Sequence, residues 1–152
     1  MMRLFSATRS VLVVLTLLSA TTVFADEYID QVRTNLQSRY DYWHNRGGGW
    51  TQLPDLQDIG LVNNGKTTSI TYTLVKGNTY KIVGVCDSEC SAIDLGLSDD
   101  TGKLIASSTA NNENPIVEVT PIRDGAFTLK VSMQKCENSL GCNYGVDVYR
   151  AR

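Results

Sequence analysis

From Thr67 onwards, apolar and polar residues alternate in short runs, which is typical of strands with one buried face. The longest clean run is 127–134, where odd-numbered residues are apolar and even-numbered ones polar. The segment Tyr80–Cys86 is apolar on both faces, which favours a central strand, and a polar turn at 87–89 joins it to a partner strand ending near Leu97. These runs predict a mainly β fold, an antiparallel jelly-roll-like β-sandwich of about seven or eight strands.

Residues 26–46 follow a different period and predict one amphipathic helix before the sandwich. Its apolar residues recur three or four positions apart and therefore share one face. They are Ile29, Val32, Leu36, Tyr40 and Trp43. Gly47, Gly48 and Gly49 are expected to end the helix. Two interpretations of the apolar face stay open: it docks on the sandwich, or it pairs with a second copy in a dimer.

The remaining segments complete the predicted organisation of the chain. Residues 1–25 combine a basic start, a short apolar run and a Val23-Phe24-Ala25 cleavage pattern, which predicts a secretory signal peptide. Residues 47–66, punctuated by Pro54 and Asn64-Gly65, are expected to form a connector to a β-sandwich domain at 67–152. We therefore expect a periplasmic or secreted protein with no membrane span after cleavage of the signal peptide.

Charge narrows the choice of partners. Removal of Arg3 and Arg9 with the signal peptide changes the formal net charge from −2 to −4. An acidic chain without a basic run does not favour nucleic acid as a partner. We expect instead a protein or glycan partner in the cell envelope or outside the cell.

Four cysteines in an exported chain indicate disulfide bonds. Three pairings are open, and a zinc site is a less favoured alternative. We expect the local pairs Cys86–Cys90 and Cys136–Cys142, because cysteines that bracket a short polar loop meet easily.

Several turn and core positions together match a known pattern. They are Gly77-x-x-Tyr80-x-Ile82, Asp94-Leu95-x-Leu97-x-Asp99-x-x-Gly102, Gly125-x-Phe127-x-Leu129-x-Val131 and Tyr144-x-Val146-x-Val148. On these motifs, residues 67–150 resemble the bacterial pre-peptidase C-terminal domain. The resemblance implies a jelly-roll-like sandwich, and in that family a place beside secreted proteases, with collagen or calcium binding in some members. This chain looks like a stand-alone secreted version with an added helix and two cysteine pairs.

Acidic residues gather in two predicted turns, Asp87 with Glu89 and Asp99 with Asp100. Solvated carboxylates that shape the turns are the simplest interpretation. Calcium is the alternative cofactor, because carboxylate oxygens are its preferred ligands. A carboxylate-based hydrolase is a further alternative, since paired carboxylates can act as acid and base. No other cofactor is expected.

A candidate ligand site lies at the end of the predicted helix. Tyr42 does not share the apolar face, and Trp50 follows the glycines, so both aromatic rings are candidates to grip a sugar ring or a peptide. We expect them to form the walls of a shallow site, with His44 as a polar contact. No residue is predicted to be catalytic, because the chain has one histidine and no recognisable triad.

The sequence therefore predicts a non-catalytic binding or interaction module of unknown ligand. A carboxylate-based hydrolase, or a calcium-dependent accessory domain of an extracellular protease system, is the alternative.

The alternation at 127–134 generates a stability prediction. We expect Phe127→Ala to lower the free energy of unfolding by about 3–5 kcal/mol, because it leaves a cavity in the core. Lys130→Ala, on the opposite face, should change it by less than about 0.5 kcal/mol. Urea denaturation of both variants checks this; equal effects would mean that the strand is assigned inside out.

Overall fold

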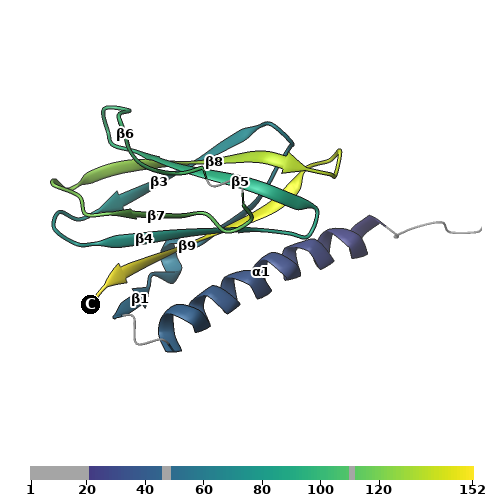
Figure 1. Cartoon of the computed structure of the whole chain (residues 1–152), viewed down its shortest axis with the longest axis horizontal. Helices are drawn as coiled ribbons and strands as arrows, with labels where there is room; N and C mark the ends of the chain where they lie inside the picture. Colours follow the sequence, from purple (N-terminus) through teal and green to yellow (C-terminus); the bar gives the residue numbers. More distant parts are fainter. Residues whose placement is uncertain (1–20, 46–48, 110–111) are drawn as a thin grey trace, which may run out of the picture.

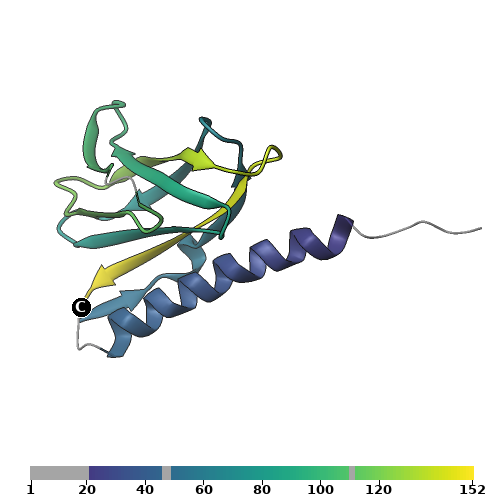
Figure 2. The ribbon, with the colours of Figure 1, turned by 45° about the vertical axis from the view of Figure 1, so that its right-hand side comes forward.

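Two antiparallel sheets and one helix form three layers (Figures 1 and 2). The structure is a computed structural model and describes residues 21–45, 49–109 and 112–152. The described residues contain nine strands, so the predicted mainly β sandwich with one N-terminal helix is confirmed. Residues 1–20 of the predicted signal peptide lie outside the described residues, and that peptide stays a prediction.

The sheet next to the helix, called sheet A, has the order β1-β9-β4-β7. Its strands are β1 (Trp50–Gln52), β9 (Cys142–Ala151), β4 (Tyr80–Cys86) and β7 (Ile116–Val119). A fifth strand, β2 (Asp58–Val62), pairs with β9 beside β1, and the short 3-10 helix η1 (Pro54–Leu56) separates the two. The central strand β4 is buried along its whole length, as its apolar faces predict.

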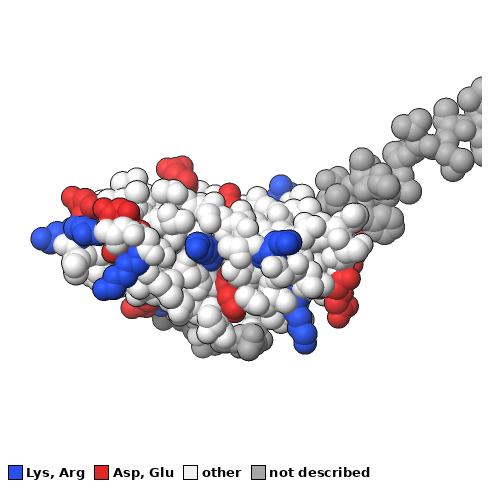
Figure 3. All heavy atoms as spheres, turned by 90° about the horizontal axis from the view of Figure 1, so that it is seen from above, with Lys and Arg blue, Asp and Glu red and all other residues white. Residues whose placement is uncertain are grey.

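The second sheet, called sheet B, has the order β3-β8-β5-β6. Its strands are β3 (Thr67–Leu74), β8 (Gly125–Cys136), β5 (Cys90–Ser98) and β6 (Leu104–Ser108). The outer face of sheet B points away from the helix, and acidic and basic side chains are both scattered over it (Figure 3).

The inward-facing residues of the two sheets make one core. Along β8 the odd-numbered residues from Phe127 to Met133 are buried, and Lys130 on the opposite face is exposed, as the alternation predicts. They meet apolar residues of β4, β5 and β9 across the sandwich. Burial of apolar surface between the sheets is the main stabilising contribution in a fold of this kind.

The turn at 87–89 has a different role from the one the sequence suggests. Strands β4 and β5 are not partners in a hairpin, because β4 belongs to sheet A and β5 to sheet B. The turn therefore crosses from one sheet to the other, and the disulfide Cys86–Cys90 closes it. The alternation pattern identifies both strands but carries no information about which strand pairs with which.

The segment expected to be a connector contributes to sheet A. Residues of β1 and β2 pair with β9, the last strand of the chain. Leu53 and Leu56, between these two strands, pack against the core. The strands are too short for a clear alternation, and their partner is distant in sequence, so the pattern alone does not reveal them.

Helix α1 (Thr21–Asn45) lies across the outer face of sheet A (Figure 1), so its apolar face docks on the sandwich. Val32 and Leu36 are buried against Val85 of β4. The absence of a side chain at Gly145 of β9 allows this close approach. A Cβ placed there would lie 2.6 Å from Val32 Cγ1 and 2.8 Å from Leu36 Cδ1.

This close approach generates a second prediction. Gly145→Ala should lower the free energy of unfolding by about 1–3 kcal/mol, because the stiff Val32 side chain cannot move aside. Gly125→Ala is the matched control, since a Cβ at Gly125 meets no other atom within 4 Å. Urea denaturation measures both, and a Gly145→Ala variant as stable as the Gly125→Ala variant would contradict the helix position.

Candidate functional site

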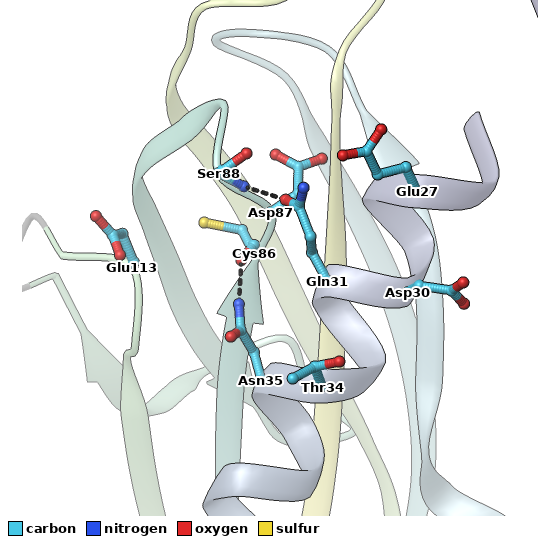
Figure 4. Close-up of a pocket in the computed structure, with 9 residues that line it drawn as sticks. All are labelled: Glu27, Asp30, Gln31, Thr34, Asn35, Cys86, Asp87, Ser88 and Glu113. Atoms are coloured by element: carbon cyan, nitrogen blue, oxygen red, sulfur yellow. Dashed lines mark hydrogen bonds between the residues drawn. The ribbon is translucent and has the colours of Figure 1, made fainter. Parts of the chain in front are cut away.

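An open groove of about 770 Å³ separates the first half of helix α1 from the turn between β4 and β5. Both walls and the loop before β7 contribute polar side chains (Figure 4). The lining residues are Glu27, Asp30, Gln31, Thr34, Asn35, Cys86, Asp87, Ser88 and Glu113. We call this the acidic groove.

Two hydrogen bonds hold the helix against the turn at the floor of the acidic groove. Asn35 Nδ2 donates to the Cys86 carbonyl oxygen at 3.0 Å, and the Ser88 backbone N–H donates to Gln31 Oε1 at 3.0 Å (Figure 4). Cys86 is also held by its disulfide to Cys90. Hydrogen bonds therefore connect the two walls, and the disulfide fixes the turn that forms one of them, so the groove is held in shape without a ligand.

The charged residues of the acidic groove are all carboxylates. Asp30 points away from the turn and pairs with Arg33 at 2.9 Å. Glu27, Asp87 and Glu113 make no ion pair within the described part of the chain. A concave surface lined by charges of one sign concentrates its field and attracts ligands of the opposite sign.

Asp87 stabilises the turn that forms one wall of the acidic groove. Its side chain is buried, and Oδ2 accepts hydrogen bonds from the backbone N–H and Nδ2 of Asn143 at 2.6 and 3.0 Å. Oδ1 accepts a third from the Glu89 N–H at 3.1 Å. Glu89 itself accepts a hydrogen bond from Asn138 Nδ2, and its interaction with Tyr28 on the helix raises the pKa of that hydroxyl. Through these contacts, the carboxylates of Asp87 and Glu89 join the loop closed by Cys86–Cys90 to the loop closed by Cys136–Cys142.

The other predicted acidic pair lies at the opposite end of β5, so the structure does not bring the two pairs together. Asp99 closes its own turn by accepting hydrogen bonds from the Thr101 hydroxyl and from backbone N–H groups. The Thr101 bond contributes most to lowering the pKa of Asp99. Arg123 pairs with both Asp99 and Asp100. Among the described residues, no three His, Cys, Asp or Glu side chains are grouped so as to hold a metal ion. Calcium binding stays a prediction.

Two residues of the predicted aromatic site, Tyr42 and His44, lie on different sides of helix α1. Tyr42 is exposed and packs edge-on against Trp43, whereas His44 stacks on Tyr40. Residues 42 and 44 lie about 200° apart around a helix, so they face different sides. The three-residue site stays a prediction, with Tyr42 and His44 on separate flanks.

One ring face of Trp50 is already occupied. The Lys81 ammonium lies 3.9 Å from the centroid of the Trp43 ring and 4.1 Å from that of Trp50, and Lys81 pairs with Glu118 at 3.5 Å. Such cation–π contacts between buried or half-buried groups are stabilising. The tryptophans therefore attach the end of helix α1 to sheet A.

Of the residues that line the acidic groove, the sequence predicts a role for only two, Asp87 as a candidate calcium ligand and Cys86 as a disulfide partner. A weak signal exists on the helix, where Glu27, Gln31, Thr34 and Asn35 recur at helical spacing on one polar flank. Such a flank is normally just solvated. Its position opposite the turn at 87–89 emerges only from tertiary packing.

The arrangement is suited to binding positively charged groups. The carboxylates and amides provide hydrogen-bond acceptors, and no basic side chain lines the groove. Two disulfides are compatible with a location outside the cytoplasm. Within the described residues, no helix contains a stretch long and hydrophobic enough to cross a bilayer.

No family model matches the sequence, and no curated protein matches it as a relative. Solved structures with similarity to the chain include the pre-peptidase C-terminal domain of a collagenase from Bacillus anthracis. It is 16% identical, with a TM-score of 0.48, and the match covers 60% of this chain and 86% of that domain. The resemblance indicated by the sequence motifs is thus also found by structure comparison.

Two further solved structures are similar. PliG, a periplasmic inhibitor of g-type lysozyme from Aeromonas hydrophila, is 12% identical with a TM-score of 0.43, covering 69% of this chain and 89% of PliG. The CBM22-1 and GH10 modules of endo-1,4-β-D-xylanase 10B from Clostridium thermocellum, complexed with xylohexaose, are 18% identical with a TM-score of 0.33. That match covers 68% of this chain but only 26% of the xylanase chain.

The buried position of Asp87 generates a third prediction. Asp87→Asn replaces one accepting oxygen by an NH₂ group, which leaves a donor facing a donor. We expect it to lower the free energy of unfolding by about 1–3 kcal/mol. Asp55→Asn, at an exposed position, should stay within about 0.5 kcal/mol. Thermal and urea unfolding compare the pair, and an Asp87→Asn variant of unchanged stability would argue against the turn geometry.

Proposed function

We propose that the chain is a non-catalytic binding module, acting in the periplasm or outside the cell, whose acidic groove holds a positively charged segment of a protein partner. The observation that carries the proposal is the convergence of Glu27, Asp87 and Glu113 from three separate elements on one open groove. None of the three is neutralised by an ion pair within the described residues.

The chemistry of the groove favours a protein over other classes of partner. Lysine and arginine side chains supply both positive charge and N–H donors, which complement carboxylate and amide oxygens. Nucleic acids and acidic glycans carry negative charge and would be repelled. A basic peptide segment is therefore the ligand with the best match.

A binding role is also supported by how the buried carboxylate is used. Asp87 directs its oxygens to three N–H donors, which stabilise the wall of the groove. A general acid or base instead needs a carboxyl group directed at the substrate. The hydrolase alternative lacks a comparable supporting observation.

The test measures binding of a labelled peptide of alternating lysine and glycine by fluorescence anisotropy, with a glutamate–glycine peptide as the reference. We expect the basic peptide alone to bind, and more weakly as salt is raised from low to physiological concentration. The double variant Glu27→Gln with Glu113→Gln should weaken it by about tenfold, since each partly exposed ion pair contributes up to about 1 kcal/mol.

A matched control separates the groove from overall charge. Asp41→Asn with Asp55→Asn also removes two negative charges, but from exposed positions outside the acidic groove. This control should bind like the unmodified protein. Equal binding of both peptides, or an equal loss in both double variants, would refute the proposed function.

A further inference from the structure

One edge of sheet A is open. Strand β7 is the last strand of this sheet and pairs, among the described strands, with β4 alone. Strand β6 is the last strand of sheet B, and it lies close to β7 without pairing with it (Figure 1). An edge strand leaves one row of backbone N–H and C=O groups without a partner strand. A further strand can therefore add to sheet A beside β7.

The register of β7 on β4 identifies the backbone groups that face this edge. Directly opposed residues of an antiparallel pair alternate between those that exchange hydrogen bonds and those that do not. The Gly84 N–H donates to the Pro115 carbonyl at 2.8 Å, one step before β7 begins. Ile116 and Glu118 therefore direct their N–H and C=O groups away from β4, and the Ile116 N–H donates to Ser108 Oγ at 3.3 Å. The Glu118 N–H and C=O have no such partner among the described residues.

A groove of about 520 Å³ lies beside this edge, and we call it the edge groove. Its apolar lining comes from both sheets and from the segment after β7, with Ile105, Val119, Pro121, Ile122 and Phe127. Ile122 is 86% exposed and Ile105 is 38% exposed, so solvent reaches this lining. Large apolar side chains that gather at an exposed place are typical of interaction sites.

A strand added to β7 would direct its side chains into the edge groove. Directly opposed residues of neighbouring strands point to the same face of a sheet. Val117 is buried and Val119 packs against the core, so a residue opposite either one points between the two sheets. There it meets Ile105 and Phe127. Backbone pairing and apolar burial thus act together, as in the addition of an extended peptide to a sheet edge.

The charged residues of the edge groove restrict the segment that fits. They are Asp99, Lys103, Glu118 and Arg123. Arg123 pairs with Asp99, and Glu118 pairs with a lysine of β4 on the outer face of sheet A. The Lys103 ammonium makes no ion pair within the described part of the chain. A largely uncharged segment with one carboxylate for Lys103 is therefore the best match.

We propose that the open edge of β7 is a second interaction surface, which binds an extended segment of a protein partner as an added strand of sheet A. The segment has apolar side chains at alternate positions and one acidic residue near Lys103. This surface is separate from the acidic groove, because the two share no lining residue. The double variant Glu27→Gln with Glu113→Gln should therefore bind such a segment unchanged, so failure of either proposal leaves the other intact.

The test follows backbone amide signals of the full chain by NMR during titration with the capped peptide Glu-Val-Thr-Val-Thr. We expect saturable shifts at Glu118 and Ile122. Two forms of the peptide serve as controls, one N-methylated at both valines and one at both threonines. Successive N–H groups of a strand point to opposite sides, so one form alone loses the donors that face β7 and should bind about tenfold more weakly. Absence of saturation, or equal effects of the two methylations, would overturn the proposal.

Side-chain variants test the edge groove. Ile122→Ser should weaken binding of the peptide by about fivefold, because it removes apolar contact area. Leu140→Ser is the matched control, since Leu140 is similarly exposed but does not line the edge groove. Lys103→Gln should weaken binding by about two- to threefold at low salt, and Lys66→Gln, at an exposed position elsewhere, should not. Equal affinities of Ile122→Ser and Leu140→Ser would contradict the proposal.

A substitution in the strand tests the edge itself. Glu118→Pro and Glu118→Ala both remove the ion pair of Glu118, but only proline removes the N–H, which an edge strand tolerates on its open side. We expect the proline variant to bind the peptide roughly fivefold more weakly than the alanine variant. Should Glu118→Pro not fold, the methylated peptides still decide the question. A dimer seen by sedimentation velocity in Glu118→Ala and absent in Glu118→Pro would assign the edge to a second copy and overturn the proposal.

Discussion

Two of the crossovers between the sheets are each closed by a disulfide, and they are the constraint on which the candidate site depends. Cys86–Cys90 joins β4 of sheet A to β5 of sheet B, and Cys136–Cys142 joins β8 of sheet B to β9 of sheet A. Cys90 and Cys136 are direct partners in sheet B, so both bonds lie at the same end of the sandwich. Closing short loops reduces the conformational freedom of the unfolded chain and fixes this end. Asp87 and Asn143 then connect one crossover to the other.

The position of helix α1 follows from this fixed end and from the outer surface of sheet A. Val32 and Leu36 fill the space left by Gly145, and Asn35 and Gln31 form hydrogen bonds with the crossover between β4 and β5. At the other end of the helix, Trp43 holds the Lys81 ammonium. The apolar stripe of the helix is thus used for docking. One of its polar flanks becomes a wall of the acidic groove.

The sequence predicts the strands and the helix of this protein better than it predicts which elements pack or pair with one another. Alternation identifies β4, β5 and β8, and helical spacing identifies the docking face of α1, because both are local signals of burial. Strands β1 and β2 escape prediction, since both pair with β9, which lies 80 to 101 positions further along the chain. The acidic groove is also formed by residues far apart in sequence: Glu27 joins Asp87 and Glu113 of the sandwich only when the helix docks. Asp147 lies in a strand where apolar and polar residues alternate in the ordinary way, and nothing in the local sequence distinguishes its buried carboxylate from a solvated one.

Charges beneath the helix link its docking to binding. Lys81 and Asp147 lie on adjacent strands of sheet A, and each is satisfied by separate partners rather than by the other. Polar contacts of this kind contribute less net stability than apolar packing of similar volume. The helix layer therefore depends on a small apolar contact, with polar groups on either side. A ligand that touches both the helix and the sheet binds only the docked arrangement, so it must stabilise that arrangement in proportion to its occupancy. Binding of the proposed ligand in the acidic groove would thus reinforce the contact that creates the groove.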